Sequence, residues 1–191
     1  EEGPEFAGQT GSDAFKRWFR NSKVVDEEGR PLTVYHGSLT RFEAFDPRRV
    51  LHLGFHFGTI EQAKDIAGRH KLIEGKKHIA PFFLSLQNPL RLPDLGDWDA
   101  DSVLRELREQ GVVDEDESDE VTDYPYDLRD GAVRQLLIDK GYDGIVYENE
   151  GEGDRESDSF IAFNPTQIKS ASSNRGSYDP NDPNTLFANY D

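Results

Sequence analysis

Two histidines stand at positions where a side chain could act on a bound ligand. His36 closes a short β-branched and aromatic run and is followed by Gly37, whose missing Cβ lets a ligand approach the main chain. His56 alternates with Phe55 and Phe57, as residues of a strand do. An imidazole titrates near neutral pH, so both positions suit ligand binding or proton transfer. A purely structural place in a strand is the alternative for each.

Carboxylates are concentrated in two runs. The run 114–123 holds seven carboxylates in ten residues with no basic side chain, and we expect a solvated loop there. It lacks the glycine and the final glutamate of a calcium-binding loop. The run 148–158 has a carboxylate at every second position, and Gly151 and Gly153 indicate a loop. This second loop joins two expected strands, where loops often carry function.

Composition excludes several kinds of chemistry. The sequence has 38 acidic and 22 basic residues and a formal charge of −16, which disfavours a broad phosphate-binding surface for nucleic acid. It contains no cysteine, which excludes disulfides, thiolate zinc sites and a cysteine nucleophile. His52 and His56 have metal-ligand spacing only on a helix, whereas the alternating residues around them favour a strand. We therefore expect no metal site.

The chain of 191 residues is long enough for one domain with a real core. Residues 1–6 look like a cloning remnant, so we expect a single domain over residues 7–191. The first residue is not Met, and we expect a fragment of a longer protein. No apolar run is long enough for a transmembrane helix, and no signal peptide is evident, so we expect a protein that is cytoplasmic or delivered into a host cell. We also expect it to be a monomer.

The elements that must position the candidate residues follow from hydrophobic periodicity. Residues 12–22 predict a helix with three aromatic residues on one face, and residues 59–62 form a capping box that opens a second helix. Further helices are predicted over 101–110 and 130–140, and strands over 32–38, 54–57, 79–86, 144–147 and 160–163. Because these elements do not alternate as βαβ units, we predict an α+β fold with a mixed or split sheet.

Three of these segments resemble a known family. The runs 34–38, 54–57 and 159–163 are similar to the signature strands of ADP-ribosyltransferases of the diphtheria-toxin and poly(ADP-ribose) polymerase branch, which carry His, Tyr and Glu in that order. The runs 22–37, 163–171 and 174–179 resemble the ADP-ribosyltransferase-like domains of phage and mobile-element polyproteins. The likeness extends over roughly residues 12–187.

The resemblance implies two small packed sheets with NAD, the substrate, in the cleft between them. It implies that His36 binds the adenosine-side ribose, that the Gly37 backbone holds the nicotinamide amide, and that Arg48 and Arg49 are candidates for the pyrophosphate. The residues implied for NAD binding are Tyr35, His36, Gly37, Ser38, Arg48, Arg49, His56 and Phe57.

This chain departs from the family pattern at two of the three signature positions. His56 stands where the family has its stacking Tyr, and Ser159 stands where it has its catalytic Glu. Glu156 or Asp158 could supply the missing carboxylate, although strand alternation would point Asp158 to the opposite face from Ser159. The expected catalytic residues are His36, His56, Glu156, Asp158 and Ser159.

The function predicted from the resemblance is an NAD-dependent mono-ADP-ribosyltransferase, acting as a bacterial or phage effector or toxin on a host macromolecule. One alternative is a diverged domain of the same fold that binds NAD or a related ligand without transfer. Another is an acidic module that binds a basic protein through its carboxylate loops. The negative charge favours a protein target over a nucleic acid and no membrane partner is expected.

Overall fold

The computed structural model describes residues 7–38, 44–46, 53–69, 78–154, 156–174 and 178–185. Residues 1–6 and the two candidate arginines, Arg48 and Arg49, lie outside these ranges. The helices are α1 (Ala7–Thr10), α2 (Asp13–Phe19), α3 (Ile60–Arg69), α4 (Ala100–Glu109), α5 (Glu115–Thr122), α6 (Tyr126–Asp139) and the 3-10 turn η2 (Pro165–Gln167). The strands are β1 (Val34–Ser38), β2 (Phe55–Phe57), β3 (His78–Leu84), β4 (Leu90–Leu92), β5 (Gly144–Glu148), β6 (Asp158–Ala162) and β7 (Ile168–Ser170).

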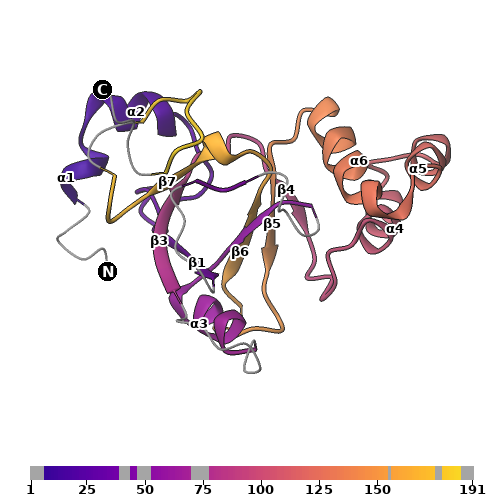
Figure 1. Cartoon of the computed structure of the whole chain (residues 1–191), viewed down its shortest axis with the longest axis horizontal. Helices are drawn as coiled ribbons and strands as arrows, with labels where there is room; N and C mark the ends of the chain where they lie inside the picture. The colour runs from indigo at the N-terminus through magenta and orange to yellow at the C-terminus, as the bar shows by residue number, and fades with distance from the viewer. Residues whose placement is uncertain are drawn as a thin grey trace.

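The strands form two small sheets (Figure 1), which confirms the predicted α+β fold with a split sheet. One sheet has the order β1-β3-β7 and is antiparallel. The other has the order β2-β6-β5-β4, in which only the β4–β5 pair is parallel. The sheets meet where Tyr35 and Gly58 exchange backbone hydrogen bonds of 2.8 and 3.1 Å.

Strand β6 is shared between two hydrophobic cores because successive side chains point to opposite faces. Phe160 and Ala162 pack with the residues between the two sheets, whereas Ile161 packs with the helices α4 and α6. A third core joins α2 to β3 through the ring of Phe15, whose centroid lies 5.2 Å from that of Phe83. Strand β6 therefore contributes residues to two different cores.

The two helices that begin at predicted caps form as the sequence indicates. The Ser12 side chain accepts from the Phe15 amide, and the aromatic residues of α2 are buried. At α3, the Thr59 amide donates to the Gln62 side chain over 2.7 Å, and the Gln62 amide donates to the Thr59 hydroxyl over 3.3 Å. The second pair completes a capping box that uses two otherwise unsatisfied amides.

The acidic run 114–123 is a helix, and the expected loop there is wrong. Asp114 and Glu117 form a reciprocal capping box, with hydrogen bonds of 2.9 and 3.0 Å. Carboxylates in a first turn also interact favourably with the helix dipole. Val121 is buried in the core and Lys140 pairs with Glu117 at 2.7 Å, so contacts outside the run offset its charge repulsion.

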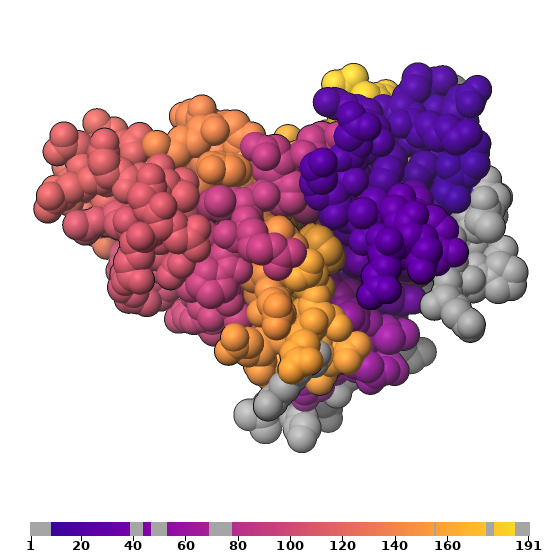
Figure 2. Space-filling view, turned by 180° about the vertical axis from the view of Figure 1, so that it is seen from behind, coloured from indigo at the N-terminus to yellow at the C-terminus, as the bar shows by residue number. Residues whose placement is uncertain are grey.

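Helices α4, α5 and α6 lie together at one end of the molecule, and α1 and α2 lie at the other (Figures 1 and 2). The predicted helices over 101–110 and 130–140 correspond to α4 and α6, and α6 begins earlier, at Tyr126. Within the part of the chain that the structure describes, no helix is both long and apolar enough to cross a bilayer.

Candidate active site

A cavity of about 720 Å³ lies where the two sheets meet, beside the start of α3 and the loop between β5 and β6. Six of the predicted site residues line it: Tyr35, His36, Gly37, His56, Phe57 and Ser159. Ser38, Glu156 and Asp158 do not line it, and Arg48 and Arg49 lie outside the described residues. The fold thus brings together segments that are more than a hundred residues apart in the chain.

His36 is held in place by a hydrogen bond and by aromatic rings. Its Nδ1 lies 2.8 Å from the backbone oxygen of His56, and because that oxygen only accepts, Nδ1 carries the proton. The ring centroid lies 5.2 Å from that of Phe45 and 5.5 Å from that of Phe57. Desolvation by these surroundings lowers the pKa of His36, although the carbonyl partly opposes the shift. His36 is therefore neutral at pH 7.

Three adjacent strands present polar and aromatic side chains on one face of the four-stranded sheet. His56 is paired with Ile161, and Tyr147 is paired with Ser159, two residues before Ile161 on the same strand. Cross-strand partners share a face, as do residues two apart, so all four point the same way. The Trp98 ring centroid lies 6.3 Å from that of His56 and 4.4 Å from that of Tyr147. These rings form an aromatic wall of the cavity.

Ser159 is buried in a chain of amide hydrogen bonds. Its hydroxyl donates to the Gln62 side-chain oxygen over 3.0 Å and accepts from the Asn149 side-chain nitrogen over 3.1 Å. The side-chain nitrogen of Gln62 donates in turn to the backbone oxygens of Asp154 and Ser157 over 3.0 and 3.3 Å. Gln62 thereby joins α3 to β6 and to the β5–β6 loop.

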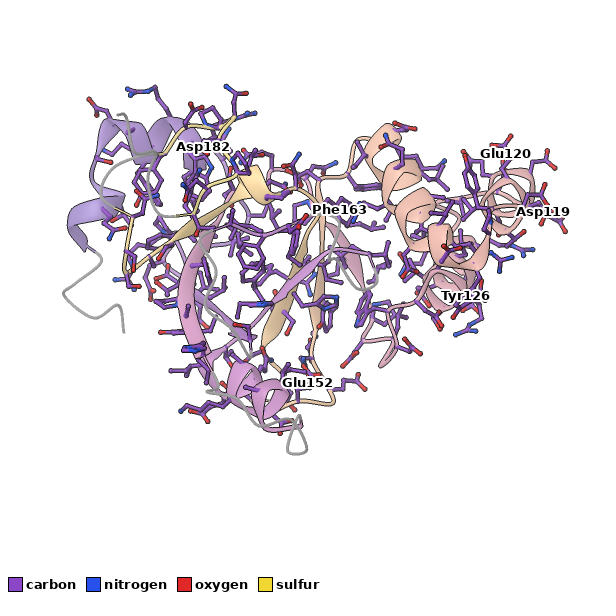
Figure 3. All side chains as sticks on the ribbon, in the orientation of Figure 1. Asp119, Glu120, Tyr126, Glu152, Phe163 and Asp182 are labelled. Atoms are coloured by element: carbon purple, nitrogen blue, oxygen red, sulfur yellow. The ribbon has the colours of Figure 1, made fainter. Side chains whose placement is uncertain are left out.

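The β5–β6 loop carries Glu152 to the cavity. The Asn149 side-chain oxygen accepts from the amides of Gly151 and Glu152 over 3.1 and 2.8 Å, and its nitrogen donates to the Glu152 carboxylate over 3.1 Å. Gly153 has a φ of +41°, and a Cβ there would lie 2.6 Å from the backbone of Glu61. Gly153 therefore lets the loop pack closely against the start of α3, beside which Glu152 is seen in Figure 3.

The two carboxylates predicted to replace the family's glutamate lie elsewhere. Asp158 forms a double hydrogen bond with the Arg91 guanidinium, at 2.7 and 3.0 Å, on the face of the sheet opposite to Ser159. This is the direction that strand alternation predicts. Glu156 is exposed, with a φ of +68°. Neither carboxylate is brought to the cavity.

Gly37 serves packing as well as access. A Cβ at this position would lie 2.5 Å from the backbone oxygen of Ala63 in α3. The glycine is thus required for the close approach of β1 to α3, while the residue still lines the cavity. Within the described ranges, no cluster of three or more His, Asp or Glu side chains that could hold a metal ion occurs.

A sequence profile described as ADP-ribosyltransferase in polyvalent proteins matches residues 26–178. The chain belongs to this family. No curated protein matches the chain. One solved structure, described as a crystal structure of an anti-CRISPR protein, is 13% identical to it. That match covers 69% of this chain and 88% of the other, with a TM-score of 0.32, which is too low to inform the fold or the function.

Several residues that line the cavity of this member of the ADP-ribosyltransferase family are not singled out by its sequence. They are Gln62, Trp98, Tyr147, Asn149 and Glu152. Gln62 was identified only as a capping residue, and Glu152 only as one of six alternating carboxylates. A usable signal for Glu152 was its place between two glycines, where a loop can turn sharply.

Proposed function

We propose that this protein is an NAD-dependent mono-ADP-ribosyltransferase that binds NAD in the cavity where the two sheets meet. The observation that carries the proposal is that the three signature segments of the family meet there, contributing His36, His56 and Ser159. Membership of the family over residues 26–178 supports transfer of ADP-ribose as the reaction class.

The chemistry of the lining supports this ligand. The aromatic wall of Trp98, Tyr147 and His56 suits stacking of a planar, cationic nicotinamide ring. Asp46, Asp94 and Glu152 add negative charge to the lining, and among the described residues no lysine or arginine lines the cavity. Neutral His36 offers a hydrogen-bonding ring held in a fixed orientation, which suits a ribose hydroxyl.

In the proposed reaction the bond between the anomeric carbon of the ribose and the nicotinamide nitrogen breaks. Nicotinamide leaves with the bonding electron pair, and the ribose develops oxocarbenium character. The acceptor group attacks the anomeric carbon and releases a proton. A preorganised negative charge beside the ribose lowers the barrier, as carboxylates do in glycoside hydrolysis.

The acceptor that we propose is a basic protein, with the chain acting as an effector or toxin. A formal charge of −16 attracts cationic partners and repels the phosphates of a nucleic acid. Mass spectrometry of a host lysate incubated with the protein and NAD should find added ADP-ribose on protein. Modification of RNA or DNA alone would contradict this choice of target.

Two measurements on the purified chain test the proposal itself. Wild-type protein should bind NAD in a calorimetric titration and release nicotinamide, whereas His36→Ala should lose NAD binding. His78→Ala is the matched control, because His78 lies in β3 and does not line the cavity. Circular dichroism establishes that each variant is folded. Equal NAD affinity in wild type and His36→Ala would remove His36 from the site.

A diverged, non-transferring protein is the second candidate, and the serine at position 159 is the observation that favours it. Ser159 cannot supply the negative charge of the family's glutamate, and its hydroxyl is engaged with Gln62 and Asn149. This candidate predicts NAD binding without nicotinamide release or transfer. Absence of NAD binding by the wild type would contradict both candidates.

A further inference from the structure

Glu152 is a carboxylate that lines the cavity and is connected through Asn149 to the serine at the third signature position. We propose that Glu152 provides the negative charge that stabilises the reacting ribose, in place of a glutamate at position 159. The assignment rests on the proposed function, since it concerns the same cavity and the same reaction. This makes Glu152 a catalytic residue. Neither the alternation of side chains in a strand nor proximity to position 159 in the sequence would select it among the carboxylates of the loop.

One side chain connects Glu152 to Ser159. The Asn149 side-chain nitrogen lies 3.1 Å from the Glu152 Oε2 and 3.1 Å from the Ser159 Oγ. Asn149 is itself buried at the end of β5, where its backbone bonds to Ser157 and Glu156 close the loop. The carboxylate and the serine hydroxyl thus share a nitrogen donor that the loop itself holds in place.

The loop backbone at Glu152 is fixed from several sides. Asn149 accepts from the amides of Gly151 and Glu152, and Asp94 accepts from the amide of Glu150 over 2.9 Å. Gly153 packs against α3 on the far side. Glu152 therefore enters the cavity from a preorganised backbone, which is what stabilisation of a developing charge requires.

The charge of Glu152 acts inside the cavity. Burial is the main cause of the raised pKa of Tyr147, and the negative charge of Glu152 and, more weakly, that of Asp94 raise it further. Tyr147 is paired with Ser159 across the two central strands, so this effect reaches the position of the missing glutamate. A negative charge that disfavours ionisation of a phenol there also favours a cationic ribose.

Two other carboxylates near the site, Asp94 and Asp158, are engaged in structural contacts. Both oxygens of Asp94 accept from backbone amides, those of Gly96 and Glu150, each over 2.9 Å. Asp158 is paired with Arg91 on the opposite face of the sheet. Glu152 retains its charge in the step, forms no bond to the sugar and transfers no proton. The nicotinamide takes the bonding pair and the acceptor loses its proton to solvent.

The test is nicotinamide release by Glu152→Gln compared with wild type. The substituted amide keeps the shape and still accepts from Asn149, so we expect an intact fold, NAD affinity within about twofold, and kcat lowered at least about tenfold. Glu152→Asp keeps the charge and should retain more turnover than Glu152→Gln. Glu150→Gln is the matched control and should keep wild-type turnover, because Glu150 is exposed on the same loop.

Asn149→Ala tests the positioning role of Asn149. It should lower kcat more than it raises KM, and it should lower kcat little further in the Glu152→Gln background, because the two residues act as a unit. Additive losses in the double variant would remove Asn149 from this role.

The possible outcomes separate this assignment from the proposed function. If wild type releases nicotinamide and Glu152→Gln is as fast, the assignment is wrong and the proposed function stands. The same holds if Glu156→Gln or Asp158→Asn loses turnover while Glu152→Gln does not. If the wild type neither binds nor cleaves NAD, the proposed function and the assignment are both overturned.

Discussion

His36 combines a place in the cavity with a place in the packing between the sheets. Its Nδ1 hydrogen bond to the His56 carbonyl joins β1 to β2, and its ring contacts Phe45 and Phe57. His36 therefore has a structural role in the packing and also lies where it could bind a ligand. A variant that removes the ring changes the cavity and also costs packing, so folding must be measured alongside binding.

The lowered pKa of His36 makes stability depend on pH in a defined direction. In the unfolded chain His36 titrates near 6.5, and in the folded chain its pKa is lower. Well above pH 6.5 the His36 ring is neutral in both the folded and the unfolded chain. As the pH falls below this value, the unfolded chain binds the proton first. The free energy of unfolding therefore falls until the pH reaches the pKa of His36 in the folded chain. Each pKa difference of one between the states corresponds to about 1.4 kcal/mol.

His36→Gln should make the stability of the protein less dependent on pH between 7 and 5. The glutamine amide can donate to the His56 carbonyl but does not titrate in this window. Urea unfolding at several pH values measures the slope for both proteins. An equal slope in wild type and His36→Gln would show that His36 has the same pKa in both states.

At the scale of elements, the site depends on how closely α3 approaches the strands and the β5–β6 loop. Gly37 lets β1 approach the Ala63 carbonyl, and Gly153 lets the loop approach Glu61. Gln62 joins the helix to β6 and to the loop through its side chain. Helix α3 is thus the element that fixes the spacing of the cavity walls.

Gly37→Ala should destabilise the protein by about 1–3 kcal/mol, the usual cost of overpacking. The added Cβ would lie 2.5 Å from a backbone oxygen, which cannot move as a side chain can. NAD affinity should fall as well, because relief of the clash separates β1 from α3. Thermal unfolding and calorimetric titration measure the two effects.

Gly131→Ala is the matched control for this substitution. Gly131 lies inside α6, and a Cβ there meets nothing within 4 Å. Alanine should stabilise the helix by about 0.5–1 kcal/mol and leave NAD binding unchanged. Similar losses of stability in both variants would mean that the contact with Ala63 is not the cause.

At the scale of the whole molecule, three hydrophobic cores share strands. Strand β6 contributes Ile161 to the core under the helices α4 and α6 and Phe160 to the core between the sheets. Strand β3 contributes Phe82 to the core between the sheets and Phe83 to the core under α2. Loss of one core should therefore weaken the strands that support the others.

The described region should unfold in one cooperative step, which its two tryptophans can report separately. Trp98 belongs to the core under α4 and α6, and Trp18 belongs to the core under α2. Leu137→Ala, at a fully buried site in α6, should lower the free energy of unfolding by about 2–5 kcal/mol. The urea midpoint reported by Trp18 and the midpoint reported by Trp98 should fall by the same amount. Fluorescence of Trp18→Phe and Trp98→Phe backgrounds during urea unfolding measures this. A shift seen only by Trp98 would identify α4–α6 as an independent unit.

Local patterns in the sequence determined the elements and the faces they bury. The capping box at Thr59 and Gln62 starts α3, and the spacing of Phe15, Trp18 and Phe19 sets the buried face of α2. Strand alternation correctly separated Asp158 from Ser159. These properties depend on residues within one or two helical turns or along one strand, so they can be predicted from the sequence alone.

Tertiary structure decided what depends on contacts between distant segments. The acidic run has its own capping box, but the contacts that offset its charge repulsion come from Lys140 and the surrounding core, which lie outside the run. The cavity received Glu152 rather than Glu156 or Asp158 because Gln62, Asp94 and Asn149 direct the path of the loop. The sequence alone identifies the loop and the carboxylates on it. Which of these carboxylates faces the cavity depends on where α3 and the segment before α4 lie, and only the folded chain determines that.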